Sequence, residues 1–323
     1  MKLNEDWRDG AGSATRDGFG AGLVEAGERH SEVYAACADL TESTRMKEFK
    51  ERFPERFVQL GVSEQLLVAL GAGLALAGKV PFLGSFAMFS PGRSWEQVRN
   101  NLCLNGANAK VVGSHAGLTV GGDGATHQAL EDLAITRTIP NLTVVVPCDA
   151  PQARQATLAL AEHVGPAYLR LGRGKIAPLT TDGTPFEIGQ AQTFREGTDL
   201  AIIACGTVMH EALAAAEELA GEGLDCRVLN MHTVKPMDRA AVLAAAEQCG
   251  AIVTVEDHQV RGGMGSRVAE ILAEERPVPI QFVGVQDAFG QSGRPEELLA
   301  EYGLDAAGIK EAARRAHGRK TGA

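Results

Sequence analysis

The stretch KVVGSHAGLTVGGDGATHQALED, residues 110–132, is the part of the chain around which we expect the fold to be built. An apolar run typical of a strand, residues 110–113, leads into a glycine-rich loop that ends where a helix is expected to begin. The loop carries four polar side chains: His115, Asp123, Thr126 and His127. Because glycines let a backbone approach a ligand, and loops at strand ends of α/β proteins collect ligand groups, we interpret this loop as a functional site. The alternative is a surface loop with incidental histidines.

Apolar runs alternate with helical segments on both sides of this stretch, which predicts an α/β sheet of about six strands. Strands are expected at residues 33–38, 57–62, 80–86, 142–147 and 167–171, and helices up to about residue 29, from residue 63 onward, and at 94–104 and 151–163. The polar stretch TESTRMKEFKERFPER, residues 41–56, is too charged to be buried. We expect a connecting loop there.

The second half of the chain predicts a smaller doubly wound domain. Glycines, two prolines and a threonine pair at residues 172–187 indicate an exposed linker. Four further strands are expected, at residues 200–205, 226–230, 251–256 and 280–285, between alanine-rich helices. We therefore place two domains at residues 1–175 and 191–323, joined by a linker at 176–190.

One turn in this second half, RGGMGSRVAEIL from Arg261, superficially resembles a phosphate-binding glycine loop. Its spacing does not match GxGxxG, and a backbone turn before a packed helix explains it equally well. Both interpretations stay open on the sequence.

Bulk composition excludes several functional classes. The 323 residues carry a formal net charge of -10 and only 5% aromatic residues, which argues against a nucleic-acid-binding surface. No apolar segment is long enough to span a bilayer, and residues 1–20 lack the pattern of a signal peptide, so we expect a cytoplasmic protein without a membrane partner. The six cysteines are scattered without a CxxC pair, which indicates core residues and neither a zinc site nor a disulfide framework.

Four separated motifs resemble the transketolase family of thiamine diphosphate enzymes: GVSEQ (61–65), GSFAMF (84–89), SHAGLTVGGDGATHQALEDLA (114–134) and TVVVPCD (143–149). The resemblance covers nearly the whole chain and is to the pyrimidine-binding and C-terminal domains, which implies two doubly wound α/β domains. Nothing in the chain resembles the family's diphosphate-binding domain. The resemblance is therefore to the C-terminal subunit of a split transketolase, made of two polypeptides.

The GDG sequence at residues 122–124 has two possible meanings, because the family's diphosphate and magnesium motif also begins with GDG. That motif requires an asparagine further on as a magnesium ligand. Residues 147–150 (PCDA) occupy the expected region, and Asn141 comes too early. The resemblance thus implies thiamine diphosphate and magnesium as cofactors, with no metal ligand on this chain and the magnesium ligands on an N-terminal, diphosphate-binding partner subunit. It also implies a homodimer core within a heterotetramer.

The resemblance implies roles for residues on the cofactor side. Glu64 is the catalytic carboxyl group that hydrogen-bonds the cofactor's pyrimidine, in an apolar setting beside Val62 and Leu67. Phe86 and Phe89 match the aromatic wall against that ring. On position alone, Glu64 reads equally well as a first-turn charge of a helix capped by Ser63.

On the substrate side, His115 and His127 are implied as catalytic residues, and together with Asp123 they contact the sugar. Their spacing, HxxxxxxxDxxxH, favours a transketolase over a 2-oxoacid dehydrogenase beta subunit, which would not need this pair of histidines for sugar recognition.

Arg16 and Arg170 fall where the family places phosphate-binding arginines, with Ser43 as a helper. A surface salt bridge is the alternative for each arginine. Residues 91–95 depart from the usual transketolase pattern, so the resemblance does not identify the aldose acceptor.

The implied reaction is transfer of a two-carbon ketol unit from a ketose phosphate to an aldose. Two other enzymes of the superfamily are alternatives: a deoxyxylulose-phosphate-synthase-like transferase and a 2-oxoacid dehydrogenase beta subunit. A noncatalytic partner module is the alternative of a different class. The presence of Glu64 and both histidines argues against that last reading.

Overall fold

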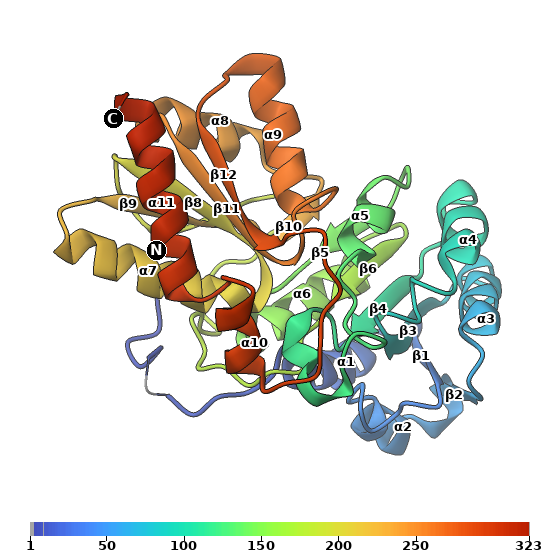
Figure 1. The fold of residues 1–323 in the computed structure, drawn as a ribbon. Helices are drawn as coiled ribbons and strands as arrows, with labels where there is room; N and C mark the ends of the chain where they lie inside the picture. Colours follow the sequence, from blue (N-terminus) through green and yellow to red (C-terminus); the bar gives the residue numbers. More distant parts are fainter. Residues whose placement is uncertain (1–2, 9, 323) are drawn as a thin grey trace.

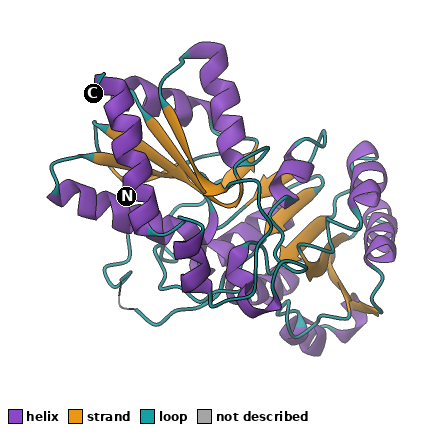
Figure 2. Ribbon diagram, viewed as in Figure 1, coloured by secondary structure: helices purple, strands orange, loops and turns teal. Residues whose placement is uncertain are grey.

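The computed structural model describes residues 3–8 and 10–322 and contains two β-sheets flanked by helices (Figures 1 and 2). The first sheet is built mainly from the first half of the chain, and the second sheet from the second half. The first half contains α1 (Thr15–Arg29), β1 (Val33–Ala38), α2 (Lys47–Arg52), η1 (Pro54–Arg56), β2 (Phe57–Leu60), α3 (Glu64–Leu76), β3 (Val80–Phe86), α4 (Trp95–Gln97), the π-helical η2 (Val98–Leu104), β4 (Lys110–Ser114), η3 (Leu118–Asp123), α5 (Asp132–Arg137), β5 (Thr143–Val145), α6 (Ala150–Glu162) and β6 (Ala167–Arg170).

The second half contains β7 (Gln192–Arg195), β8 (Leu200–Ala204), η4 (Gly206–Val208), α7 (Met209–Gly221), β9 (Cys226–Asn230), β10 (Thr233–Lys235), α8 (Arg239–Cys249), β11 (Ile252–Gln259), α9 (Met264–Glu275), β12 (Ile280–Val285), α10 (Pro295–Glu301) and α11 (Ala306–Thr321). No helix in the described ranges is both long and apolar enough to cross a membrane.

The first sheet has the strand order β10-β5-β6-β4-β3-β1-β2, and all of its strands are parallel except β10. Both of its faces are covered, as a mostly parallel sheet requires. Along β1, Ala35 and Cys37 pack into the core beneath α1 and α6, whereas Ala36 and Ala38 pack into the core that includes α3. The second sheet has the order β12-β11-β8-β9-β7, with only β7 antiparallel. The predicted fold class is confirmed.

The first sheet has seven strands, where the sequence predicted about six. The additional strand, β10, comes from the second half of the chain and pairs with β5, Thr233 opposite Val145. A three-residue strand has too few positions to show a period of two, so its pattern was not visible. Because β10 joins the other half's sheet, a boundary at 176–190 divides the sequence but not the hydrogen-bonded sheet.

Two local expectations were wrong. The charged stretch 41–56 is not only a loop, because it forms α2 and η1; Phe49 alone is buried on α2, and the charged side chains of α2 are exposed. Ser63 precedes α3, but its hydroxyl donates to the carbonyl of Gly61 (3.2 Å) and does not cap the helix.

The glycine loop, residues 115–128, is closed at its base. The backbones of Ala116 and Ala129 pair, and Gly117 donates its N–H to the carbonyl of Ala129 at 3.0 Å. His115, directly after β4, has a φ of 57°, a left-handed conformation that is uncommon for a residue with a side chain. The chain therefore turns sharply at the end of β4 and presents His115 at the edge of the sheet.

The turn at residues 261–265 is a packed backbone turn, as the second interpretation held. The buried carboxylate of Glu256 accepts hydrogen bonds from the N–H groups of Met264 (2.7 Å) and Gly265 (2.9 Å) at the start of α9. A Cβ on Gly263 would lie 2.1 Å from a Glu256 oxygen. The side chain of Glu256 thus fills the position that a phosphate would take at a glycine loop.

Candidate active site

The candidate site lies where β3 and β4 end side by side. Phe86 is the last residue of β3 and pairs in register with Ser114, the last residue of β4. The carboxyl ends of parallel strands meet at one edge of a sheet, so side chains that follow them come together. Accordingly, the rings of Phe86 and His115 stack with centroids 3.9 Å apart and an interplanar angle of 29°.

Four rings gather at this edge: Phe86, Phe89, His115 and His127, which we call the ring cluster. Phe86 and Phe89 are nearly parallel with centroids 6.3 Å apart, and His127 stands edge-on to Phe89 at 5.3 Å. The structure therefore brings together the expected aromatic wall and both expected catalytic histidines.

His115 is a neutral imidazole in this setting. It is 3% exposed, and burial lowers its pKa to about 3, helped by the positive charges of Arg16, Arg173 and Arg45. Arg16 lies 3.3 Å from Nε2 and can only donate, so Nε2 accepts and we assign the ring proton to Nδ1, where the hydroxyl of Ser114 accepts it at 2.9 Å. Between pH 6.5 and about 3, the unfolded chain binds a proton on this histidine and the folded chain does not. The contribution of His115 to the free energy of unfolding therefore falls as the pH decreases through this range.

Glu64 begins α3 and is 1% exposed. Its carboxylate oxygen Oε2 accepts a hydrogen bond from Nη1 of Arg93 at 2.8 Å, and the Arg93 guanidinium also lies over the Phe89 ring, 4.9 Å from its centroid. The expected apolar setting is therefore only half correct: Leu67 is buried, but Val62 is 71% exposed and a cation contacts the carboxylate. Arg93 links Glu64 to the ring cluster.

Arg93 is absent from the site residues expected from the sequence, although its segment differs from the family pattern. The residue lies within the segment 91–95, which departs from the usual family pattern directly after the two phenylalanines.

A second cationic group lies on the loop side of His115. Nη1 of Arg16 donates to the backbone carbonyl of Ser43 at 2.9 Å, so Arg16 and Ser43 are adjacent, as expected. Arg173 donates to the carbonyl of Val120 (3.0 Å) and approaches Oδ2 of Asp123 (3.3 Å). Arg173 is thus a site residue that the sequence interpretation missed.

The phosphate role expected for Arg170 does not fit the structure. Arg170 is 6% exposed, and its guanidinium donates to Asp132 from Nε (2.7 Å) and Nη2 (3.1 Å), with further bonds to the carbonyls of Ala129 and Asp257. The alternative, a salt bridge, is what the structure contains, but it is buried and not on the surface. Arg170 lies on β6, whereas Arg173 follows the strand end and is half-exposed; a second arginine in YLRLGRGK was the available signal.

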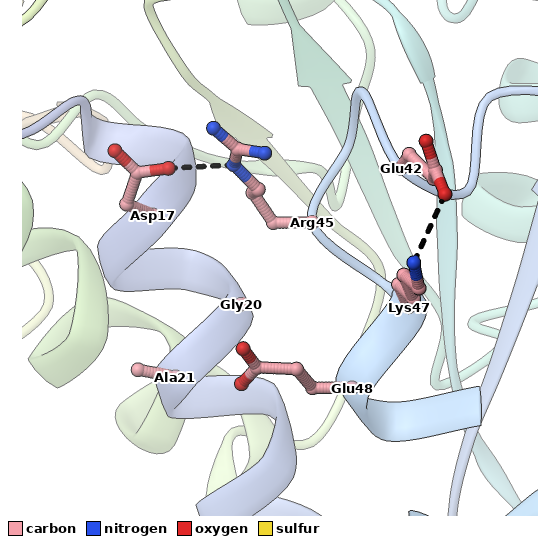
Figure 3. Close-up of a pocket in the computed structure, with 7 residues that line it drawn as sticks. All are labelled: Asp17, Gly20, Ala21, Glu42, Arg45, Lys47 and Glu48. Carbon is pink, nitrogen blue, oxygen red and sulfur yellow. Dashed lines mark hydrogen bonds and ion pairs between the residues drawn. The ribbon is translucent and has the colours of Figure 1, made fainter. Parts of the chain in front are cut away.

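A cavity of about 490 Å³ lies between α1 and the start of α2, and Asp17 and Arg45 are among the residues that line it (Figure 3). Asp17 accepts from Arg45 at 2.6 Å, and Glu42 accepts from Lys47 at 3.1 Å. No member of the ring cluster lines this cavity. In the described part of the chain, no three His, Cys, Asp or Glu side chains are grouped so that they could hold a metal ion.

Two family models match the chain. The transketolase pyrimidine binding domain matches residues 11–178, and the transketolase C-terminal domain matches residues 189–309.

Individual relatives match over almost their whole length. The 6-deoxy-6-sulfo-D-fructose transketolase subunit SqwH of Clostridium sp. (strain MSTE9) is 41% identical over 98% of this chain and 95% of its own. An apulose-4-phosphate transketolase subunit of Phocaeicola vulgatus is 38% identical over 92% of this chain and 95% of its own. A split-gene transketolase, solved as an inactive beta4 tetramer, superposes with a TM-score of 0.89 at 43% identity, over 95% of this chain and 99% of that one. The chain therefore belongs to the transketolase family, of which it carries the pyrimidine-binding and C-terminal domains.

Proposed function

We propose that this chain is the pyrimidine-binding subunit of a split transketolase, which moves a two-carbon ketol unit from a ketose phosphate to an aldose. One observation carries the proposal: a buried carboxylate, Glu64, lies at the first turn of α3 and is linked through Arg93 to the ring cluster. Transfer of this kind needs a carboxyl group for the pyrimidine and aromatic faces for its ring.

Thiamine diphosphate fits the residues present. Glu64 would hold the pyrimidine, and Phe86 and Phe89 would pack against its ring, where such stacking contributes about 0.5–1.5 kcal/mol beyond burial. When bound, the cofactor supplies the electron sink for breaking the bond between C2 and C3 of the ketose. Arg93 donates to Oε2 of Glu64, and a carboxylate has a second oxygen that can share a proton with the pyrimidine.

The two histidines and Asp123 would handle the sugar. His115 is neutral, so its ring can accept or donate a hydrogen bond without a change of charge, and its position at the edge of the sheet is held by Ser114 and Arg16. His127 is only partly buried, and the hydroxyl of Thr126 lies 2.9 Å from its Nδ1. Asp123 is exposed on the same loop and suits a sugar hydroxyl.

We assign phosphate recognition to Arg16 and Arg173, with Ser43 beside them. Arg173→Ala is expected to raise the KM for a phosphorylated sugar by about 10- to 100-fold, because a hydrogen bond to a charged group contributes about 1.5–3 kcal/mol. Steady-state kinetics of the assembled enzyme would measure this. Arg276→Ala, at the C-terminal end of α9 with a 49% exposed side chain, is the matched control. An unchanged KM for Arg173→Ala would remove that residue from the phosphate site.

An exposed apolar face of helix α3 favours the presence of a partner chain. The helix α3 buries Leu67 and Val68 against the sheet, yet Leu66 and Leu76 on its other side are 54% and 72% exposed. In Figure 1, α3 lies at the outer edge of the first sheet, away from the second sheet. A helix that is apolar all round is normally buried, so we propose that another chain of the assembled enzyme packs here, beside Glu64. The diphosphate and its magnesium would then be bound by an N-terminal partner subunit.

Mixing experiments test the split arrangement. We expect no ketol transfer by the purified chain alone. We expect activity when thiamine diphosphate, magnesium and a second chain that carries the diphosphate and magnesium motif are added. The same partner mixed with the Glu64→Ala chain is the control. Strong activity of this chain alone would overturn the split arrangement, and assays over a panel of phosphorylated ketoses would identify the donor.

A further inference from the structure

The end of β11 carries three consecutive buried residues, Glu256, Asp257 and His258, and each accepts hydrogen bonds from the backbone of a different segment. Glu256 holds the first turn of α9 through the N–H groups of Met264 and Gly265. Nε2 of His258 accepts from the N–H groups of Leu133 (3.2 Å) and Ala134 (3.4 Å) in the first turn of α5. This strand of the second sheet thus holds the start of a helix in each half of the chain.

Asp257 reaches into the glycine loop itself. Its Oδ1 accepts from the backbone N–H of Leu118 at 2.8 Å, and its Oδ2 accepts from the hydroxyl of Thr119 at 3.2 Å and from the N–H of Thr119 at 3.5 Å. Gly117 has a φ of +83°, and a Cβ at that position would lie 2.0 Å from Oδ2. The backbone that follows His115 is therefore built around the Asp257 carboxylate.

Other contacts from the second half hold the far side of the same loop. Nε2 of Gln128 donates to the carbonyl of Gln291 at 2.9 Å, and the hydroxyl of Ser292 donates to the carbonyl of Gly122 at 3.0 Å. The loop that carries His115, Asp123 and His127 is thus attached to the C-terminal domain at both ends. Of these contacts, only that of Asp257 is charged and buried, with 4% exposure.

We propose that Asp257 of the C-terminal domain is a positioning residue for the sugar site, which it holds in place through the backbone of residues 117–119. This rests on the proposed function. The carboxylate touches neither the sugar nor the cofactor; it fixes the turn from which His115 and Asp123 project. The C-terminal domain would then contribute to sugar affinity, although no ring or phosphate-binding residue of the site belongs to it.

Hydrogen exchange of the full chain tests the positioning directly. In Asp257→Asn, which keeps the shape and one acceptor oxygen, we expect the amides of Leu118 and Thr119 to exchange about 10- to 100-fold faster, because a charged acceptor is lost. Glu256→Gln is the matched control, since it makes the same isosteric change on the neighbouring residue but faces α9. Thr119→Val, which removes only the hydroxyl contact, is expected to give a smaller acceleration. Loop exchange in Asp257→Asn equal to that in Glu256→Gln overturns the proposal.

Kinetics of the reconstituted enzyme test the consequence for the sugar. Asp257→Asn is expected to raise the KM for the ketose phosphate at least tenfold, with unchanged affinity for thiamine diphosphate, whereas a general structural defect would change both. An active enzyme with a wild-type KM overturns the proposal. If wild-type subunits transfer no ketol unit from any sugar, the proposed function falls, and the exchange measurement alone then decides whether Asp257 positions the loop.

Discussion

Glu64→Gln is expected to lower the rate of proton exchange at C2 of thiamine diphosphate in the reconstituted enzyme by about 10²- to 10⁴-fold, the usual range for a lost acid–base group. The amide keeps the shape of the side chain and can still hydrogen-bond, but it cannot share a proton with the pyrimidine. Glu64→Ala, which removes the hydrogen bond as well, is expected to abolish this activation. Exchange followed by NMR in deuterated buffer measures the step without the sugar.

The control for this experiment is Glu247→Gln on α8. Glu247 is also a glutamate in an ion pair, but its side chain is 67% exposed and belongs to the second half of the chain. Proton exchange at C2 of thiamine diphosphate in the enzyme reconstituted with Glu247→Gln should proceed at the wild-type rate. If Glu64→Gln also exchanged at the wild-type rate, the carboxylate would be no more than a first-turn charge of α3.

Asp132→Asn is expected to reduce the free energy of unfolding by about 3–5 kcal/mol, because it leaves the buried guanidinium of Arg170 without its counter-charge. Asp132 accepts two hydrogen bonds from Arg170 and a third from the hydroxyl of Tyr168 at 2.7 Å. The surrounding charge and hydrogen bonds hold the pKa of Asp132 below its usual value despite its burial. Urea denaturation of the purified chain measures the loss.

Asp225→Asn is the matched comparison. Asp225 pairs with Arg195 at 2.9 Å, but its side chain is 51% exposed, and surface pairs contribute about 0–1 kcal/mol. A similar, small loss for both variants would show that the Arg170 pair does not stabilise the fold. That result would reopen the phosphate role for Arg170.

Much of the architecture could be predicted because buried strands and helices show their environment in their own residues. The apolar runs became β1, β3, β4, β8 and β9 with bounds close to those expected. The order of the motifs identified the family. Site residues at or directly after strand ends, Phe86 and His115 among them, came together as expected. In these cases the information is local.

Partners that are distant in sequence could not be predicted. Arg170 and Arg173 are three residues apart and equally basic, yet one lies within β6 and bonds Asp132, whereas the other follows the strand and faces Asp123. Similarly, α2 was assigned to a loop because only one of its residues, Phe49, is buried. Composition does not distinguish these outcomes.

The residues of the chain were sufficient to identify two doubly wound α/β domains, the transketolase family and a glycine loop with a carboxylate and two histidines. Only the tertiary structure showed that Arg173 faces the loop and that Arg93 contacts Glu64. It also showed that β10 joins the sheet of the other half and that Asp257 holds the backbone after His115. The physical reason is the distance along the sequence over which each kind of information acts. Hydrophobic periodicity and motif spacing act over a few residues, whereas the hydrogen bonds that hold the site loop join residues up to 170 positions apart, and folding alone brings these together.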